Sequence, residues 1–187
     1  RPSKDGLNAV GFPSGVAGVP AEVIESLSAV VLKRRELRAD SGGPGTWRGG
    51  LGQLTEFARR GDGKWSVSSI ADRTQYPALG LLGGHAGAAG EVTTGDGVKL
   101  HAKALKDLTK GEVIHVNLPG GGGYGDPFKR APEKVLWDVI EGYVTAAAAA
   151  KQYGVAVTYS GLADALVKLP EEWQVDVART AALRRGH

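Results

Sequence analysis

Polar and apolar residues alternate over much of the first two thirds of the chain, and this two-residue period is typical of β-strands with one buried face. The alternation is clearest at Trp65, Val67 and Ser69. It predicts strands at 51–60, 64–70, 101–105 and 112–118, and residues 91–100 carry a Gly95-Asp96-Gly97 turn. The Gly61-Asp62-Gly63 sequence predicts a hairpin turn between the first two. We therefore expect residues 1–127 to consist mainly of strands and loops.

Two N-terminal segments depart from this pattern. Residues 1–20 contain several glycines and prolines but few periodic apolar positions, so we expect an irregular arm, ordered by contacts with the rest of a parent subunit or with another chain. Residues 21–38 have a mixed pattern that we interpret as one or two strands, with a helix at 21–28 as the alternative. The charged run at 33–36 predicts a solvated strand edge.

A helical period replaces the alternation after residue 127. Pro132 is a favourable first-turn residue and Gly142 is a stop signal, which together predict a helix. Thr145 can cap the alanine-rich run that Gly154 ends. The remaining predicted elements are a short strand at 155–157 and an amphipathic closing helix at 171–185 that includes Trp173. The expected fold is α+β, with a strand-rich region and long glycine-rich loops followed by C-terminal helices in 128–187, within one region of 187 residues.

The glycine content is the feature of the composition that says most about the loops. Glycine accounts for 29 of 187 residues, roughly double ordinary usage. Three patches, at 42–52, 80–90 and 120–125, hold more than half of these glycines. Ordering a glycine costs more backbone entropy than ordering any other residue, so folded proteins keep glycine runs where φ is positive or where backbone meets another surface. Pro119 and Pro127 stiffen the ends of the third patch. We therefore predict a shaped loop at 120–125 and not a flexible linker.

Composition narrows the class of protein further. The chain has no cysteine, which excludes disulfides, thiolate zinc sites and cysteine nucleophiles, and suits a cytoplasmic protein. The net charge of +3 is too small a bias to indicate nucleic-acid binding, and no apolar run predicts a membrane span or a signal peptide. The absence of methionine indicates a processed chain or a piece of a longer protein. We expect a cytoplasmic protein without nucleic-acid or membrane partners.

No single motif specifies a reaction. The chain has no G-x-x-x-x-G-K-[ST] phosphate loop, no G-x-S-x-G nucleophile elbow, and no strand that leads through G-x-G-x-x-G into a helix. The four histidines lack metal-ligand spacing, so we expect no metal bound by this chain alone, and we interpret His101, His115 and His187 as ordinary polar residues. His85 differs because it lies within a glycine loop, where an acid, a base or a ligand is well presented.

Other residues beside the glycine loops are candidates for contact with a polar substrate. For the charged ones the alternative is that they satisfy backbone groups of the loops, and the sequence leaves both interpretations open. The full set of candidate substrate-site residues is Asp40, Ser41, Arg48, Arg73, His85, Gly121, Gly122, Tyr124 and Asp126. The sequence does not assign a catalytic role to any of them.

Four segments are informative when taken jointly. They are RELRADSGGPG at 35–45, WRGGLG at 47–52, GLLGG at 80–84 and PGGGGYGDP at 119–127. Together they resemble the C-terminal part of the hydantoinase B/oxoprolinase family, and the segments at 4–15 and 153–155 also fit. The resemblance covers almost the whole chain, and the joint occurrence of the loops is far more specific than any one of them.

The resemblance implies an ATP-dependent amidohydrolase that opens a cyclic amide such as a hydantoin or oxoproline. It implies a hetero-oligomer in which a hydantoinase A-type subunit binds the ATP. Because the chain resembles only about the last third of family members, the other implied partner is the N-terminal remainder of the same subunit. That remainder holds the family's histidine- and aspartate-containing segment, which is associated with a divalent metal, so we expect this chain alone to be inactive. The alternatives are a fragment of a related ATP-dependent ketone carboxylase and a non-catalytic structural or assembly module.

Overall fold

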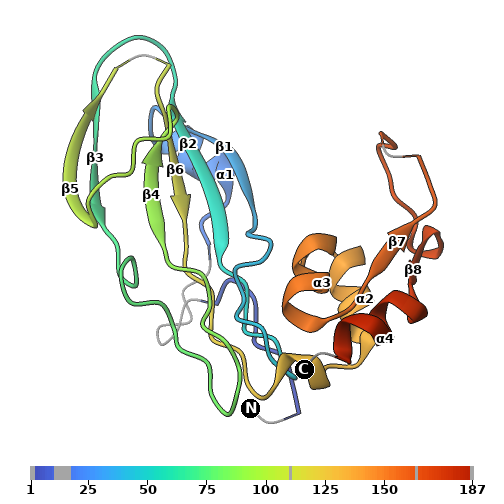
Figure 1. Ribbon diagram of the computed structural model, residues 1–187. Helices are drawn as coiled ribbons and strands as arrows, with labels where there is room; N and C mark the ends of the chain where they lie inside the picture. Colours follow the sequence, from blue (N-terminus) through green and yellow to red (C-terminus); the bar gives the residue numbers. More distant parts are fainter. Residues whose placement is uncertain (1–2, 11–17, 110, 163, 186–187) are drawn as a thin grey trace.

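The computed structural model describes residues 3–10, 18–109, 111–162 and 164–185. Figure 1 shows an antiparallel strand region on one side, a smaller helical region on the other, and irregular segments that join them. The mixed α+β class with C-terminal helices is confirmed. The described part of the N-terminal arm contains no helix or strand before residue 21, as predicted, and residues 11–17 of that arm lie outside the described part.

The strand region is built from two antiparallel layers. Its elements are α1 (Ala21–Leu27), β1 (Val30–Leu37), β2 (Gln53–Arg59), β3 (Trp65–Ile70), β4 (Glu91–Thr94), β5 (Lys103–Leu108) and β6 (Val113–Asn117). A four-stranded sheet has the order β1-β2-β6-β4, and a separate ribbon pairs β3 with β5. The ribbon lies beside β4 (Figure 1), and the buried side chains of Val92, Leu108 and Ile114 pack between the two layers.

The strand pairing corrects the predicted hairpin at 61–63. β2 pairs on its two edges with β1 and β6, so β3 crosses to the other layer and pairs with β5. Gly61 and Gly63 have φ values of 72° and 131°, which a tight turn of this kind can use. The turn is therefore present without pairing across it, because the pairing depends on which strand edges are still free.

The first part of the segment at 21–38 is a helix, which was the alternative interpretation of its sequence. Residues 21–27 form α1, so the expectation of strands from residue 21 is wrong. The helix ends at Ser28, which is extended and whose hydroxyl donates to Ile24 O (2.8 Å). β1 is an edge strand of the sheet and residues 33–36 are exposed, which confirms the predicted solvated edge.

The helical region has its own small core. Its elements are η1 (Pro127–Lys129), α2 (Pro132–Ile140), α3 (Ala146–Tyr153), β7 (Val157–Tyr159), η2 (Pro170–Glu172), β8 (Trp173–Val175) and α4 (Val177–Arg184). Thr145 Oγ1 accepts a hydrogen bond from Ala148 N (3.1 Å), and Gly154 follows α3 with φ 62°, so both predicted caps are confirmed. Buried side chains of α2 and α3 pack together, with β7 and β8 partly covering them.

The closing helix is shorter than predicted. It begins at Val177 and not at residue 171, and the side chain of Asp176 caps it. Residues 173–175 form β8 instead, because they pair with β7 and place the Trp173 ring 4.7 Å from the ring of Tyr159. The predicted strand at 155–157 accordingly begins at Val157. Cross-strand pairing here outweighs the helical period of the sequence.

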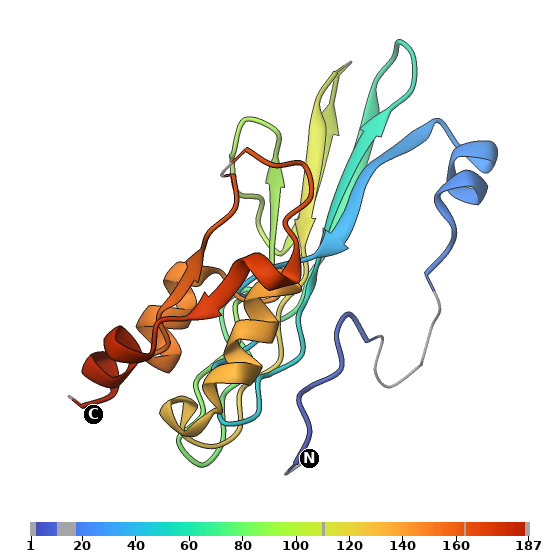
Figure 2. The same cartoon turned by 90° about the vertical axis from the view of Figure 1, so that its right-hand side faces the viewer.

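Figure 2 shows that the helical region lies at one end of the strands and does not cover a face of the sheet. The glycine-rich segments lie where the two regions meet (Figures 1 and 2). These irregular segments therefore determine how the strand region is joined to the helices.

Candidate functional site

Three glycine-rich segments pack into one unit, which we call the glycine body: residues 41–52, 79–90 and 119–126. Their main chains exchange hydrogen bonds directly. Gly43 N donates to Gly121 O (2.8 Å), Gly121 N to Gly50 O (2.9 Å) and Gly123 N to His85 O (2.9 Å). Segments that are far apart in the sequence therefore contact each other backbone to backbone.

In the third segment of this body, close approach requires glycine at 122 and 123, while Gly125 has a positive φ of 74°. A Cβ on Gly122 would lie 2.1 Å from Leu79 O, and a Cβ on Gly123 would lie 2.0 Å from Pro44 O. Real Cβ atoms essentially never come this close to a neighbouring atom, so a side chain would push the segments apart. The predicted close contact is confirmed, and a flexible linker does not describe this loop.

The glycine body does not offer a phosphate cradle along 120–125. Such a cradle needs backbone N–H groups that are free to face the anion. The N–H groups of Gly120, Gly121, Gly123 and Gly125 already donate to carbonyl groups of the other two segments. These residues therefore do not fit a nucleotide phosphate.

Tyr124 lies at the centre of a short ladder on the glycine body. It bridges Trp47 on one side and Leu81 on the other, and Trp47 and Tyr124 exchange two backbone hydrogen bonds of 3.0 Å. Directly paired residues place their side chains on the same face. Trp47, Tyr124 and Leu81 therefore form a row, with Lys134 Nζ 4.2 Å from the centroid of the Trp47 ring.

Beside the glycine body, four charged side chains form a network in which three are buried and Asp5 is 31% exposed. Arg130 is 1% exposed and donates to both oxygens of Asp5, at 2.7 and 2.9 Å. It also donates to Asp138 Oδ2 (2.8 Å), and Asp138 Oδ1 accepts from Arg48 Nε (3.3 Å). The two arginines balance the two aspartates, which is why this many charges can be buried together.

Burial and pairing shift the titration of these groups in different directions. Burial opposes the charge of Asp5, but hydrogen bonds from Arg130 and Arg48 outweigh it and hold the pKa of Asp5 below its usual value. Burial raises the pKa of Asp138, although Arg130 and Arg48 act against the change. Burial also raises the pKa of Tyr153. The network joins the N-terminal arm, the glycine body and α2, so its role is to hold them together.

The arm therefore draws its order from this chain. Besides the Asp5 contacts, Gly6 N donates to Arg48 O and Ala9 N donates to Leu51 O, each at 2.8 Å. Asn8 Oδ1 accepts from Leu51 N (3.0 Å). For residues 5–9 these contacts lie within this chain, and the expected contacts of the arm with other parts of a parent subunit or with another chain stay a prediction.

Four of the predicted site residues bind backbone groups, and one of them is Arg48, which donates to Gly49 O (2.8 Å). Asp40, which has φ 58°, accepts from Thr145 N (2.8 Å) through its side chain. The Ser41 hydroxyl accepts from Gly52 N (2.9 Å), and the Asp126 side chain accepts from Phe128 N (2.9 Å) at the start of η1. For Asp40 and Asp126 this is the alternative that the sequence left open. Arg48 lies in the buried network.

The other predicted site residues lie in different places. Gly121 and Gly122 are inside the glycine body, where Tyr124 is half-buried. The His85 side chain is exposed on the same body, and the backbone N–H of this residue donates to Pro44 O (2.7 Å). Arg73 is exposed and lies away from them, at a cleft described below.

Two of the remaining histidines have the partners expected of ordinary polar residues. His115 Nδ1 lies 3.2 Å from a carboxylate oxygen of Glu56. His101 Nδ1 accepts from Lys103 N at 3.2 Å. His187 lies outside the described residues.

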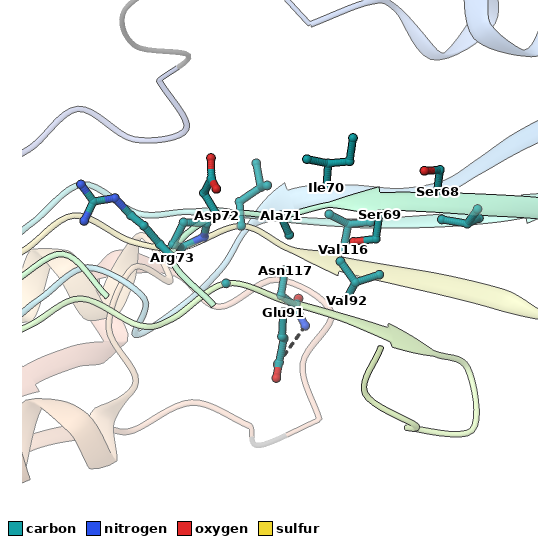
Figure 3. A pocket seen from close by; sticks show the side chains of 14 residues that line it. Ser68, Ser69, Ile70, Ala71, Asp72, Arg73, Glu91, Val92, Val116 and Asn117 are labelled. Carbon is teal, nitrogen blue, oxygen red and sulfur yellow. Dashed lines mark hydrogen bonds between the residues drawn. The ribbon is translucent and has the colours of Figure 1, made fainter. Parts of the chain in front are cut away.

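A cleft of about 390 Å³ opens between β3 on one side and β4 and β6 on the other. Its walls are mainly apolar and include Val67, Val92 and Val116. Figure 3 shows Asn117 and Glu91 joined by a hydrogen bond of 3.2 Å, with the side chain of Asp72 pointing away from them. Of the predicted site residues, Arg73 lines this cleft and the others do not.

Asn117 follows Val116 on β6, so its side chain points with Glu91 to the opposite face of the sheet from the apolar wall of the cleft (Figure 3). Its Nδ2 donates to Glu91, which fixes the orientation of the amide and leaves Oδ1 buried without a hydrogen-bond partner. Small-molecule sites are usually clefts with mainly apolar walls. This cleft is therefore suited to an apolar group, and the buried Oδ1 of Asn117 does not line it.

In the described part of the chain, no group of three or more His, Cys, Asp or Glu side chains is placed to hold a metal ion. A divalent metal therefore does not fit these residues. Among the described helices, none is long and apolar enough to cross a membrane.

Sequence reasoning missed both the buried network and the cleft. Asp5 and Arg130 are 125 residues apart and belong to no motif. One signal was available, because Asp138 lies on the same helical face as Val135 and Val139, and a charge on a buried face requires a buried partner. Nothing in the local pattern indicated which partner.

The fold has counterparts among large ATP-dependent enzymes. The crystal structure of an ATP-dependent caprolactamase from Pseudomonas jessenii matches with a TM-score of 0.72 and 28% identity, over 96% of this chain and 32% of that one. A nucleotide-free acetone carboxylase structure matches with a TM-score of 0.75 and 24% identity, over 98% of this chain and 28% of that one. The second likeness shows a shared fold.

The sequence comparisons give the family. The model of the hydantoinase B/oxoprolinase family matches residues 1–127. A protein of Pseudomonas sp. (strain NS671) described as the B-type subunit of a D-/L-hydantoinase is 37% identical over 167 residues, which covers 86% of this chain and 28% of that protein. The chain belongs to the hydantoinase B/oxoprolinase family, so the resemblance stated from the loops is confirmed. It spans about 28% of the length of this relative.

Proposed function

We propose that this chain is the C-terminal region of a hydantoinase B-type subunit, and that the complete enzyme opens a cyclic amide in an ATP-dependent reaction. The substrate class is a hydantoin, oxoproline or related lactam. The observation that carries the proposal is the likeness to the ATP-dependent caprolactamase, which combines the same fold over 96% of the chain with 28% identity. The 37% identity to the hydantoinase protein of Pseudomonas sp. supports the same class of ring amide.

In this proposal the nucleotide is bound elsewhere. Five N–H groups along 120–125 already donate to carbonyl groups, namely those of Gly120, Gly121, Gly123, Tyr124 and Gly125. We therefore assign ATP binding to a hydantoinase A-type partner subunit. We assign a divalent metal to the N-terminal portion of the subunit, because the described residues offer no cluster of ligands for it.

The chain itself contributes exposed polar groups and a rigid frame. A ring amide has a carbonyl that accepts hydrogen bonds and an N–H that donates one. Arg73 lines the cleft and can donate to the carbonyl. His85 and Tyr124 face a site that other segments complete. Asp40, Ser41 and Asp126 act as positioning residues, because their side chains hold the loops.

The test is an assay of the complete complex for ring opening of caprolactam, hydantoin and 5-oxoproline, with and without ATP. We expect the complex to open at least one of these rings, and only with ATP, and we expect residues 1–187 alone to open none. Failure of the complex on all three substrates contradicts the proposed activity. Turnover by the purified chain alone contradicts the assignment of the nucleotide and the metal to other segments.

A ketone carboxylase is the second candidate, because the acetone carboxylase structure shares the fold over 98% of this chain. The same complex is therefore given acetone, bicarbonate and ATP. Formation of a new carboxylate without any lactam opening replaces the first proposal with this one. A non-catalytic module is favoured instead if changes at Arg73, His85 and Tyr124 all leave turnover unchanged.

A further inference from the structure

The glycine body presents an apolar turn to solvent. Residues 79–82, which we call the leucine turn, contain Leu79, Leu81 and Leu82, and these side chains are 79%, 66% and 75% exposed. Tyr76, just before the turn, is 82% exposed. Single exposed leucines are ordinary, whereas several large apolar side chains in so short a segment form a patch of the kind that binds another surface.

The segment around the turn also lacks charge. Residues 74–90 contain no Asp, Glu, Lys or Arg, although these types make up 23% of the sequence. Leu105 gives the contrast: it is 74% exposed but lies on β5 between Lys103, Lys106 and Asp107. The centres of closed interfaces are depleted of charge, because burying an unpaired charge is costly. The composition of the leucine turn therefore suits a permanent contact better than a transient one.

The backbone of the turn is firmly held. Leu81 N donates to Gly123 O (3.0 Å), Gly125 N donates to Leu81 O (2.9 Å), and Gly84 N donates to Leu81 O (3.0 Å). The leucine side chains are therefore presented from a fixed main chain. A preorganised surface loses less conformational entropy when a partner covers it.

One leucine of the turn has an unfavourable backbone conformation. Leu82 has φ 50°, in the left-handed region that residues other than Gly, Asn and Asp rarely adopt. A glycine would avoid this cost, and the exposed Leu82 side chain gains little burial within this chain. Residues held in such conformations tend to occur at functional contacts.

We propose that the leucine turn is the element by which this chain packs permanently against the N-terminal portion of the hydantoinase B-type subunit. The match covers 28% of the hydantoinase relative and 32% of the caprolactamase chain, so most of such a subunit lies outside residues 1–187. That portion belongs to the same polypeptide, so it is present wherever this chain is and can cover the turn permanently. The row of Trp47, Tyr124 and Leu81 extends the contact across the glycine body. The inference rests on the proposed function for the existence of this portion, but not for the reaction.

Photo-cross-linking in the complete complex tests the identity of the partner. Benzoylphenylalanine replaces Leu82 or, as a control, Lys64 in the connection between β2 and β3, which lies at the end of the strand region remote from the glycine body (Figure 1). We expect cross-links from position 82 to peptides of the N-terminal portion, identified by mass spectrometry, and none to that portion from position 64. Cross-links from position 82 to the ATP-binding subunit or to a second copy of this chain, or none at all, overturn the proposal.

Substitution of Leu82 gives a second test, because a free and a buried side chain predict different directions of change in the thermal midpoint. Leu82→Gly and Leu82→Asn both suit a left-handed backbone, so they raise or preserve the thermal midpoint if the side chain is free. If the side chain is buried against the N-terminal portion, both lower the midpoint of the complete complex, by about 2 °C or more. The control Leu105→Asn has the same residue type and similar exposure, and we expect it to leave the midpoint unchanged. Midpoints for both Leu82 variants at or above the parent value overturn the proposal.

The proposed reaction and the proposed docking of the leucine turn can be contradicted independently of each other. Cross-links to the N-terminal portion in a complex that opens no lactam leave the docking in place and remove the proposed reaction. A complex that opens a lactam while position 82 stays free of cross-links keeps the reaction and removes the docking.

Discussion

Asp5 and Arg130 form a bidentate ion pair, with N–O distances of 2.7 and 2.9 Å, across 125 residues of sequence. Arg130 is 1% exposed, and its other charged partner is Asp138 at 2.8 Å. The pair fastens the N-terminal arm to the start of the helical region. Its contribution to stability can be measured directly.

Asp5→Asn is expected to lower the free energy of unfolding by about 3 kcal/mol at neutral pH, because removal of one partner leaves a buried arginine short of compensating charge. Urea unfolding gives this value. The matched control is Asp107→Asn on β5, where the side chain is exposed and the expected change stays within about 0.5 kcal/mol. Equal losses for the two variants would show that the ion pair does not hold the arm.

The same pair predicts a pH dependence. The pKa of Asp5 is lower in the folded chain than its ordinary value of 3.8, so its contribution is present above that value and is lost as the pH falls through the folded pKa. Asp138 has the opposite sign, because burial raises its pKa and its contribution is lost as the pH rises. Asp138 is present in both the parent and Asp5→Asn, and its pKa is lower in the variant because the charge of Asp5 is one of the causes that raise it.

We therefore expect the difference in unfolding free energy between the parent and Asp5→Asn to shrink as the pH falls below about 4, because Asp5 becomes protonated in the unfolded chain before it does in the folded one. Urea titrations of both proteins between pH 7 and pH 3 measure it. A difference that stays constant over this range contradicts the assignment of the lowered pKa to Asp5.

Alanine substitutions in the glycine body should differ sharply between neighbours. Gly122→Ala and Gly123→Ala place a Cβ 2.1 and 2.0 Å from carbonyl oxygens, so we expect each to cost about 3 kcal/mol or to prevent folding. The Cβ of Gly121→Ala would lie 3.3 Å from Gly50 N, its nearest neighbour, so we expect about 1 kcal/mol or less. Thermal unfolding of the three variants measures this order. Three equal effects would mean that close approach is not what selects glycine here.

Hydrogen exchange can check that this chain orders its own arm. The amides of Gly6 and Ala9 are bonded to Arg48 O and Leu51 O, so both should exchange slowly in the parent. In Asp5→Asn we expect their protection to fall by about tenfold or more, while β2 amides keep theirs. Fast exchange at both positions in the parent would show that the arm is not held by these bonds.

Several features of the fold could be predicted from the sequence, because neighbouring residues decide them. Thr145 and Gly154 bound α3 through a side-chain cap and a left-handed backbone, both of which act within one helical turn. The solvated edge at 33–36 follows from its charges. The family could be recognised because the spacing of the three glycine loops is itself a property of the sequence.

Tertiary structure decided the features that depend on distant partners. β3 left its predicted hairpin because β1 and β6 occupy both edges of β2. Trp173 joined a strand because Tyr159 lies opposite it. Which backbone each glycine touches, and which aspartate neutralises Arg130, became definite only when the segments packed, because a close contact or a charge pair is a property of two positions and a local pattern describes one.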